Sequence, residues 1–297
     1  MYGSFEELQR AARTSGSMGG AIAEREATET GQRPESIRAE MAEALQVMRE
    51  AVAEGLSGGA KSRSGLVGGD AARVANSSAG PLTGVVPTAV AYALAVGEVN
   101  ASMGRIVAAP TGGASGVLPG VLLAVAETCD ATDGDLVEAL LTASGIGGVI
   151  ASRATLSGAA GGCQAEIGSA AAMAAGAAAQ LCGGSPDQIG HAASLGLQGL
   201  LGLVCDPIGG LVEVPCVARN GTAAAMALAA AHMALAGVTF PVPFDEVADA
   251  MASVGRSLPP TLRETALGGL AATSTGRALA ETASCTSERL APEGSDG

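Results

Sequence analysis

Apolar residues recur in this chain mainly at the three- and four-residue spacing of an α-helix. The clearest stretch covers residues 34–48, where the apolar positions are Ile37, Met41, Ala44, Leu45 and Met48. Pro34 and Glu35 open this stretch, and a proline followed by an acidic residue is typical of a first helical turn. The pattern predicts an amphipathic helix packed on the body of the protein. An arm that binds a partner would show the same pattern.

The rest of the chain alternates between Ala-rich apolar stretches and short turns marked by Gly and Pro. The apolar stretches predict helices over residues 88–97, 119–129, 133–158, 164–181, 186–203, 221–236 and 245–254. Glycines inside 133–158 predict breaks there, and Ser185 is expected to cap the helix that follows it. Alternating runs of β-branched residues are nearly absent. The predicted fold class is therefore all-α, a compact packing of Ala/Gly-rich helices.

Changes in composition divide the chain into three parts. Residues 1–55 concentrate charge and are predicted to form an N-terminal amphipathic helical segment packed on the body. Residues 56–277 form the main domain, which begins with a Gly/Ser-rich loop. Residues 278–297 are polar without an apolar period, and we expect a disordered tail.

Composition and charge narrow the possible functions. Of the 297 residues 48% are hydrophobic but only 2% aromatic, with 44 Gly and no Trp. A core of Ala, Leu, Val and Met allows helices to approach closely. The net charge of −13 argues against a nucleic-acid partner, because phosphate binding needs clustered Lys and Arg. The opening residues lack the basic and apolar regions of a signal peptide, so we expect a cytoplasmic protein with reduced cysteines.

One apolar stretch raises the question of a membrane span. Residues 220–244 contain no Asp, Glu, Lys or Arg and are long enough to cross a bilayer. The stretch is mostly Ala, contains His232, and ends in Phe240-Pro241-Val242-Pro243. No asymmetry of Lys and Arg flanks it. We therefore expect a buried helix and no membrane association.

Three of the six cysteines, Cys163, Cys205 and Cys216, lie in turns marked by Gly or Pro. Cys163 precedes an Ala-rich helix, whose N-terminal dipole favours a thiolate. Cys205 is followed by Asp-Pro and Cys216 is preceded by Pro, so both are expected in loops. Three thiolates are one short of a closed four-thiolate metal site, so an iron–sulfur cluster held by them would keep one open, Lewis-acidic iron. Their spacings of 42 and 11 residues match no zinc pattern, so three buried, inert thiols remain the alternative.

Other reactive side chains are few. Cys129 and Cys182 are expected to be structural thiols in apolar surroundings at helix ends, and Cys285 an inert thiol in the tail. His191 and His232 fall on predicted helices among apolar residues, which favours structural roles. The candidate general bases are then Lys61, if burial lowers its pKa, and the carboxylates Glu166 and Asp206 beside the cysteines.

Two Gly-rich segments, residues 65–70 and 110–116, offer backbone N–H groups to an anion. Neither matches a nucleotide-binding fingerprint. Tight turns between helices are the alternative.

Long motifs now become informative when they are taken together. They are Asn100-Ala-Ser-Met-Gly-Arg-Ile-Val-Ala-Ala-Pro-Thr111, Gly158-Ala-Ala-Gly-Gly-Cys-Gln-Ala-Glu-Ile-Gly-Ser169, Gly202-Leu-Val-Cys-Asp-Pro207, Gly210-Leu-Val-Glu-Val-Pro-Cys216, Leu262-Arg-Glu-Thr265 and Gly268-Gly-Leu-Ala-Ala-Thr273. From about residue 5 to about residue 280 the chain closely resembles the α subunit of iron–sulfur-dependent L-serine dehydratase (L-serine ammonia-lyase).

The resemblance implies a function and a cofactor. It implies that residues 56–277 are an all-helical catalytic domain with an oxygen-sensitive [4Fe–4S] cluster on Cys163, Cys205 and Cys216. It implies conversion of L-serine to pyruvate and ammonia without pyridoxal phosphate. It also implies a hetero-oligomer with a β subunit, whose Ser-Ser-His-Thr-type motif carries the suspected base. This chain has no such motif.

With that reaction in view, small polar residues in the Gly-rich turns become candidates for holding the substrate. They are Ser64, Gly65, Asn100, Thr111 and Ser115, with Lys61 and Glu166 as catalytic candidates beside a main base on the partner. The chain departs from the usual family pattern at one turn. The family usually has Ala-Gly-Ser after a Pro-Thr pair, whereas this chain has Gly112-Gly113-Ala114 there. A related lyase acting on cysteine or threonine, or a non-catalytic sensor or scaffold, therefore remains an alternative.

Overall fold

The computed structural model describes the backbone of residues 1–289 and side chains through residue 283; residues 290–297 are not described. The described residues contain no β-strand, only an isolated bridge between Cys205 and Arg263. The helices are α1 (Phe5–Ser15), α2 (Met18–Thr30), α3 (Pro34–Leu56), α4 (Asp70–Ala75), α5 (Val85–Ala101), α6 (Val117–Cys129), α7 (Asp133–Arg153), α8 (Gly158–Gly161), α9 (Ile167–Leu181), α10 (Pro186–Gln198), α11 (Cys216–Leu235), α12 (Phe244–Ser257) and α13 (Ser274–Arg289). The all-α prediction is confirmed.

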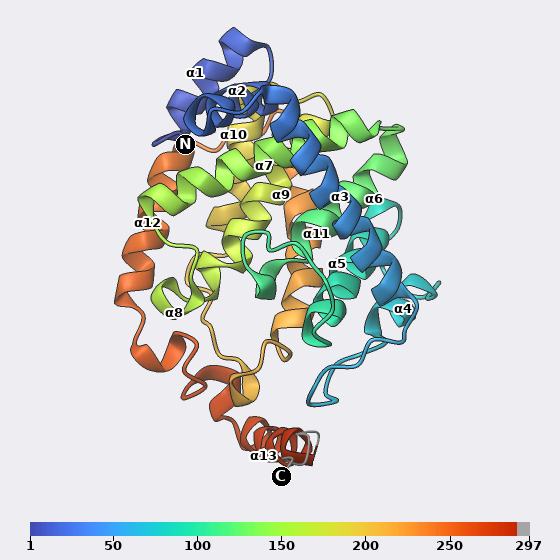
Figure 1. Cartoon of the computed structure of the whole chain (residues 1–297). Helices are drawn as coiled ribbons and strands as arrows, with labels where there is room; N and C mark the ends of the chain where they lie inside the picture. Colours follow the sequence, from blue (N-terminus) through green and yellow to red (C-terminus); the bar gives the residue numbers. More distant parts are fainter. Residues whose placement is uncertain (290–297) are drawn as a thin grey trace, which may run out of the picture.

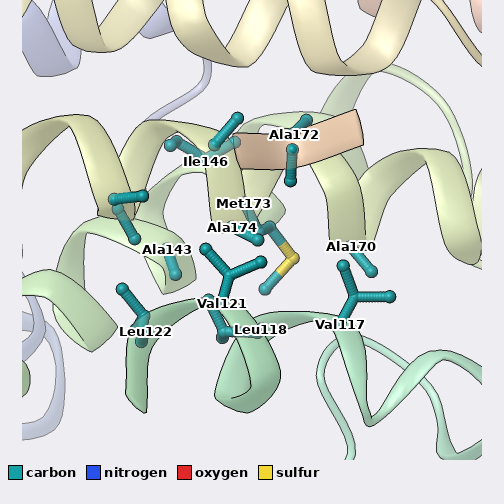
Figure 2. Close-up of a cluster of buried hydrophobic side chains, with 14 of the residues drawn as sticks. Val117, Leu118, Val121, Leu122, Ala143, Ile146, Ala170, Ala172, Met173 and Ala174 are labelled. Atoms are coloured by element: carbon teal, nitrogen blue, oxygen red, sulfur yellow. The ribbon is translucent and has the colours of Figure 1, made fainter. Parts of the chain in front are cut away.

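Helix α9 is the centre of the core. Every residue of α9 from Ile167 to Ala179 is buried, and α6, α7, α10 and α11 pack around it (Figure 1). Figure 2 shows the side chain of Met173 pointing toward α6, beside Val121 and Leu118. The surrounding positions on α9 are alanines, and small side chains let the neighbouring helices approach closely. A core almost without rings is thus built by close packing of small residues.

One glycine contact shows how close the helices come. Gly145 of α7 lies directly against the side chain of Ile22 in α2, and a Cβ added there would overlap Ile22. The close approach of α2 therefore requires glycine at this position of α7. The predicted breaks do not occur, and α7 ends at Arg153 rather than at residue 158.

The helix starts follow their capping residues. Ser185 caps α10 and accepts a hydrogen bond from the N–H of Gln188, whose side chain bonds back to the Ser185 N–H. This reciprocal arrangement satisfies two backbone donors that the helix leaves unpaired. The Ser185 prediction is confirmed, but α10 stops at Gln198, five residues before the predicted end.

The amphipathic helix near the N-terminus is α3, and its prediction is confirmed. Ile37, Leu45 and Met48 are buried, and Met41 and Ala44 are half-buried. Helix α3 packs on α5 and α7, with its exposed face carrying most of the charge.

The stretch 220–244 comprises most of α11, much of it buried, followed by a loop. Two other segments, Gly112–Cys129 and Asp133–Arg153, are long and apolar enough to cross a membrane, but 61% and 72% of them are buried inside the protein. Both are core helices.

The C-terminal prediction is wrong for part of its range. Residues 278–289 continue helix α13 instead of forming a disordered tail. Helix α13 packs on the turn Ile208–Gly210, where Ala280 contacts Gly209, and Ala283 is buried. A small apolar surface supplied by another part of the chain stabilises this polar helix. Residues 290–297 of the predicted tail lie outside the described residues.

Tyr92 on α5 gives a spectroscopic prediction, because the chain has two Tyr and no Trp. Burial, with a 2.6 Å hydrogen bond to Glu127, raises the pKa of Tyr92 to about 12. An unfolded tyrosine titrates near pH 10. The folded state therefore holds this proton more tightly, and the stability that results is present below pH ~10 and lost as pH rises toward ~12.

Spectrophotometric titration of the folded wild type should show one tyrosine that ionises near pH 12. This step should be absent from Tyr92→Phe, which retains only Tyr2. Urea unfolding should show a smaller loss of stability above pH ~10 for Tyr92→Phe than for wild type. Equal losses in the two proteins would contradict the assignment.

Candidate metal centre

Cys163, Cys205 and Cys216 line one small cavity. Two of these cysteines come from just after α8 and from the start of α11, and both of these helix ends lie in the lower half of the view in Figure 1. The other residues lining the cavity are Gly113, Glu166, Ile167, Pro207, Val212 and Glu264. The structure therefore brings together three thiols that are up to 53 residues apart in the sequence. Cys129 and Cys182 do not line this cavity.

Each thiol is held by a different local structure. Cys163 begins a 3₁₀ turn, Cys163–Ala165, directly before α9, near the predicted helix N-terminus. Cys205 lies in an extended loop, as predicted. Cys216 was also predicted in a loop, but it is the first residue of α11, because the preceding proline is compatible with a helix start.

A segment near the C-terminus pairs with the Cys205 loop. The Cys205 N–H donates to Leu262 O at 2.9 Å, and the Glu264 N–H donates to Cys205 O at 2.8 Å. This pairing brings the Glu264 carboxyl to the cavity, although the residue is 59 positions from Cys205. Ligand atoms of Glu166, Cys205 and Glu264 all lie within 4.8 Å of one another.

A buried ion pair fixes the other side of the Cys205 loop. Arg219 of α11 donates to Val204 O at 3.0 Å and to Asp206 Oδ1 at 2.8 Å. Asp206 Oδ2 accepts the Leu270 N–H at 2.7 Å. Asp206 is 2% exposed. Because its carboxylate is fully engaged, Asp206 is a structural group and not the free base considered from the sequence.

The three thiols differ in acidity. A hydrogen bond from Cys205 and the positive charge of Arg219 lower the pKa of Cys163. The same hydrogen bond, together with burial, raises the pKa of Cys205. Burial and the nearby charge of Cys163 raise the pKa of Cys216 to about 12. Cys163 is therefore the thiol that ionises first.

Glu166 is half-buried at the edge of the cavity. Burial raises the pKa of its carboxyl, and the nearby Thr111 hydroxyl opposes that shift. The Cys205 thiol is 3.9 Å from Glu166 Oε2, a long contact. The Thr111 hydroxyl is buried but makes no hydrogen bond of ordinary geometry in the described residues. Thr111 and Glu166 thus place two polar groups beside the thiols.

Two predicted substrate ligands are occupied by the protein itself. Ser115 is fully buried, and its hydroxyl donates to Gly112 O at 2.7 Å. The Ser64 N–H and hydroxyl both donate to the buried carboxylate of Glu213, three residues before Cys216. Both serine hydroxyls are therefore hydrogen-bonded to groups of the protein itself.

The first Gly-rich segment also binds an anion from within the chain. The N–H groups of Gly69, Asp70 and Ala71 donate to the Glu98 carboxylate, which is fully buried. Gly65 and Lys61 are exposed on the same loop. Neither residue lines the cysteine cavity.

The second segment, residues 110–116, surrounds Asn220 of α11. The Gly116 N–H donates to Asn220 Oδ1 at 2.9 Å, and Asn220 Nδ2 donates to Gly113 O at 2.8 Å. Asn100 lies half-buried against Gly112. Of the five predicted substrate ligands, Thr111 and Ser115 belong to this segment and Asn100 lies against it. The Ser115 hydroxyl is hydrogen-bonded to Gly112 O, whereas the buried Thr111 hydroxyl has no partner among the described residues.

The remaining predicted residues lie apart from the cavity. Cys129 and Cys182 lie at helix ends as expected, but both are exposed, so their predicted apolar surroundings are wrong. The Nδ1 atom of His191 accepts the Phe240 N–H, which supports its structural role, and His232 is exposed on α11. The side chain of Cys285 lies outside the described residues.

Sequence reasoning missed the residues that hold the site together. They are Glu98, Glu213, Arg219, Asn220 and, at the cavity, Glu264. Glu213 and Glu264 were visible inside the quoted motifs but had no assigned role. The contacts that give them roles join distant segments, which spacing does not reveal.

The donor set suits a soft metal centre. Three converging thiols, one of them with a lowered pKa beside an arginine, are the ligand type of iron–sulfur and other thiophilic metal sites. Carboxylates of Glu166 and Glu264 lie at the same cavity. The fold and site thus define an all-helical protein with a three-thiol centre and an adjacent carboxylate pair.

The comparisons with known proteins identify the family. The serine dehydratase alpha chain family model matches residues 13–271, and the chain belongs to this family. It is 50% identical over 251 residues to the probable L-serine dehydratase, alpha chain, of Bacillus subtilis, covering 82% of each chain. It is 45% identical over 248 residues to the L-serine dehydratase, alpha chain, of Peptoniphilus asaccharolyticus, covering 82% of this chain and 85% of that one. The resemblance stated from the motifs is confirmed.

A further relative is longer. The L-serine dehydratase of Streptomyces coelicolor is 41% identical over 275 residues, which is 90% of this chain but 60% of that protein.

Proposed function

We propose that this chain is the cluster-bearing subunit of an L-serine ammonia-lyase, which eliminates water from L-serine and releases pyruvate and ammonia. The observation that carries the proposal is the convergence of Cys163, Cys205 and Cys216 on one cavity in a chain of this family. The proposed cofactor is a [4Fe–4S] cluster with these three ligands. When bound, it supplies a Lewis-acidic iron that makes the β-hydroxyl of serine a better leaving group.

A single lysine supports a reaction without pyridoxal phosphate. That cofactor is held as a Schiff base on a lysine. Lys61 is the one lysine in the sequence, and it is exposed on a loop outside the cysteine cavity.

The carboxylates and Thr111 are the proposed contacts of the chain with the substrate. Glu166 Oε2 lies beside Cys205, so a proton on this carboxyl is placed next to the reacting groups. Thr111 and Asn100 hold the amine and carboxylate of serine. The main base that removes the α-proton belongs to a β subunit, which the name "alpha chain" of two relatives supports. Lys61 becomes a second candidate base only where a partner buries it.

Glu166→Gln tests the role of this carboxyl. The substitution is expected to lower kcat about 100-fold, because the amide of Gln cannot donate or accept the proton that the Glu166 carboxyl carries. Iron content and KM should change little. Steady-state kinetics with L-serine and iron analysis provide the measurement. Glu246→Gln, on the exposed first turn of α12, is the matched control. An unchanged kcat in Glu166→Gln would remove Glu166 from the mechanism.

Anaerobic purification tests the function as a whole. The chain, with and without its β subunit, is assayed for iron, sulfide and release of pyruvate from L-serine. We expect about four irons per chain and turnover only in the complex. An active preparation without iron would refute the cluster. No turnover by the cluster-loaded complex would favour a sensor or scaffold.

The substrate alternative has a separate test. The ratio of kcat/KM for L-serine, L-threonine and L-cysteine decides between serine dehydratase and a related lyase. We expect serine to be preferred, as the names of the relatives indicate.

A further inference from the structure

A second pocket, of about 410 Å³, lies between α1, α10 and the start of α12, away from the cysteines. These three helices pack on one another (Figure 1). Phe5, Phe240 and Phe244 line the pocket, and the rings of Phe5 and Phe244 meet edge to face with centroids 5.3 Å apart. The sequence has three Phe, two Tyr and no Trp, so most of its aromatic rings meet here. Its volume is in the range of small-molecule sites.

Helix α10 presents two hydrogen-bond donors to this pocket, His191 and Ser194. The His191 Nδ1 atom accepts the Phe240 N–H at 3.3 Å, so the neutral ring carries its proton on Nε2. Ser194 is 1% exposed. The described residues supply no hydrogen-bond partner for the Ser194 hydroxyl or for His191 Nε2. Because buried polar groups are normally paired, these two donors on one helix face indicate an acceptor on a bound molecule.

Carboxylates give the pocket an acidic side. Glu6, Asp187 and Asp245 line it, and the residues described as lining it include no lysine or arginine. Asp245 is engaged by the protein, because it accepts two backbone N–H groups of α1. Glu6 and Asp187 pair with arginines of α1, but every side chain in these two pairs is at least 60% exposed. Such pairs contribute less than about 1 kcal/mol, so a bound cation can replace the arginine.

The donors, the carboxylates and the rings together select a zwitterion with an apolar body. A ligand carboxylate accepts from His191 Nε2 and the Ser194 hydroxyl. A ligand ammonium group lies near Asp187, four residues before His191 and thus about 6 Å along the helix. An apolar side chain packs on the phenyl rings.

We propose that this pocket binds a free α-amino acid with an apolar side chain. The inference goes beyond the proposed function and does not rest on it, because the pocket shares no lining residue with the cysteine cavity.

Calorimetric titration of the full chain with L-phenylalanine and with L-leucine tests the site. We expect saturable binding to wild type. Ser194→Ala and His191→Asn should each weaken it about 10-fold or more, since each removes a hydrogen bond to a charged group. Asn keeps an acceptor near the position of Nδ1 and removes Nε2.

The matched controls are His232→Asn and Ser257→Ala, at an exposed histidine of α11 and an exposed serine of α12. Neither residue lines the pocket, so both variants should bind like wild type. Circular dichroism verifies that each variant is folded. Unchanged affinity in both Ser194→Ala and His191→Asn would overturn the proposal, as would the absence of binding of both amino acids to wild type at millimolar concentrations.

Two derivatives test the chemical class of the ligand. N-acetyl-L-phenylalanine lacks the ammonium group and L-phenylalaninamide lacks the carboxylate, so each should bind about 10-fold more weakly than L-phenylalanine, or worse. Equal affinity for either derivative would overturn a zwitterionic ligand. Binding is measured without a cluster, a partner or turnover, so its failure is distinguishable from failure of the proposed function.

Discussion

Replacing Cys163, Cys205 or Cys216 by alanine is expected to abolish the iron–sulfur chromophore and to reduce lyase activity to below about 1% of wild type. Each substitution removes one of three converging thiols and leaves at most two ligands for the cluster. Iron and sulfide analysis, visible absorption and pyruvate release, all under anaerobic conditions, measure the effect.

Cys129→Ala and Cys182→Ala are the matched controls, because both thiols are exposed at helix ends outside the cavity. We expect wild-type iron and activity from them. Full cluster content in any variant of the three cavity cysteines would show that this residue is not a ligand. Loss of the cluster in a control would place the centre elsewhere.

Arg219→Met is expected to have the largest effect on stability, a loss of about 3–5 kcal/mol in the free energy of unfolding. The substitution leaves Asp206 buried, with its side chain 3% exposed and no counterion. It also removes the donor to Val204 O, next to Cys205. Urea unfolding under anaerobic conditions measures the change.

Two further variants make the result specific. Arg13→Met breaks an ion pair whose side chains are 62% and 60% exposed, and should cost less than about 1 kcal/mol. The double variant Arg219→Met/Asp206→Asn removes both charges and should recover part of the loss. A cost for Arg219→Met no larger than that for Arg13→Met would contradict a structural role for the buried pair.

The helices followed from local features of the sequence. The spacing of Ile37, Leu45 and Met48 located α3, and Ser185 located the start of α10, because amphipathic periodicity and capping act over a few residues. Errors arose where distant contacts intervened. Gly145 lies within an unbroken α7 where α2 packs closely against it, and residues 278–289 are helical where α13 packs on residues 208–210.

The candidate site was likewise predictable from the sequence only in part. The motifs selected Cys163, Cys205 and Cys216 from six cysteines, and the structure brings these three together. The substrate ligands were harder to select, because a serine in a Gly-rich turn can bind a ligand or the protein. Ser64 and Ser115 bind the protein. Their partners, Glu213 and the carbonyl of Gly112, become apparent only in the folded chain.

The sequence by itself determined the all-helical class, the family and the three thiols, since these depend on periodicity and on contiguous motifs. The tertiary structure decided what surrounds the thiols. It paired Arg219 with Asp206 and brought Glu264 to Glu166 across 98 positions. These arrangements depend on contacts between segments far apart in the chain, whose geometry is fixed only when the helices pack.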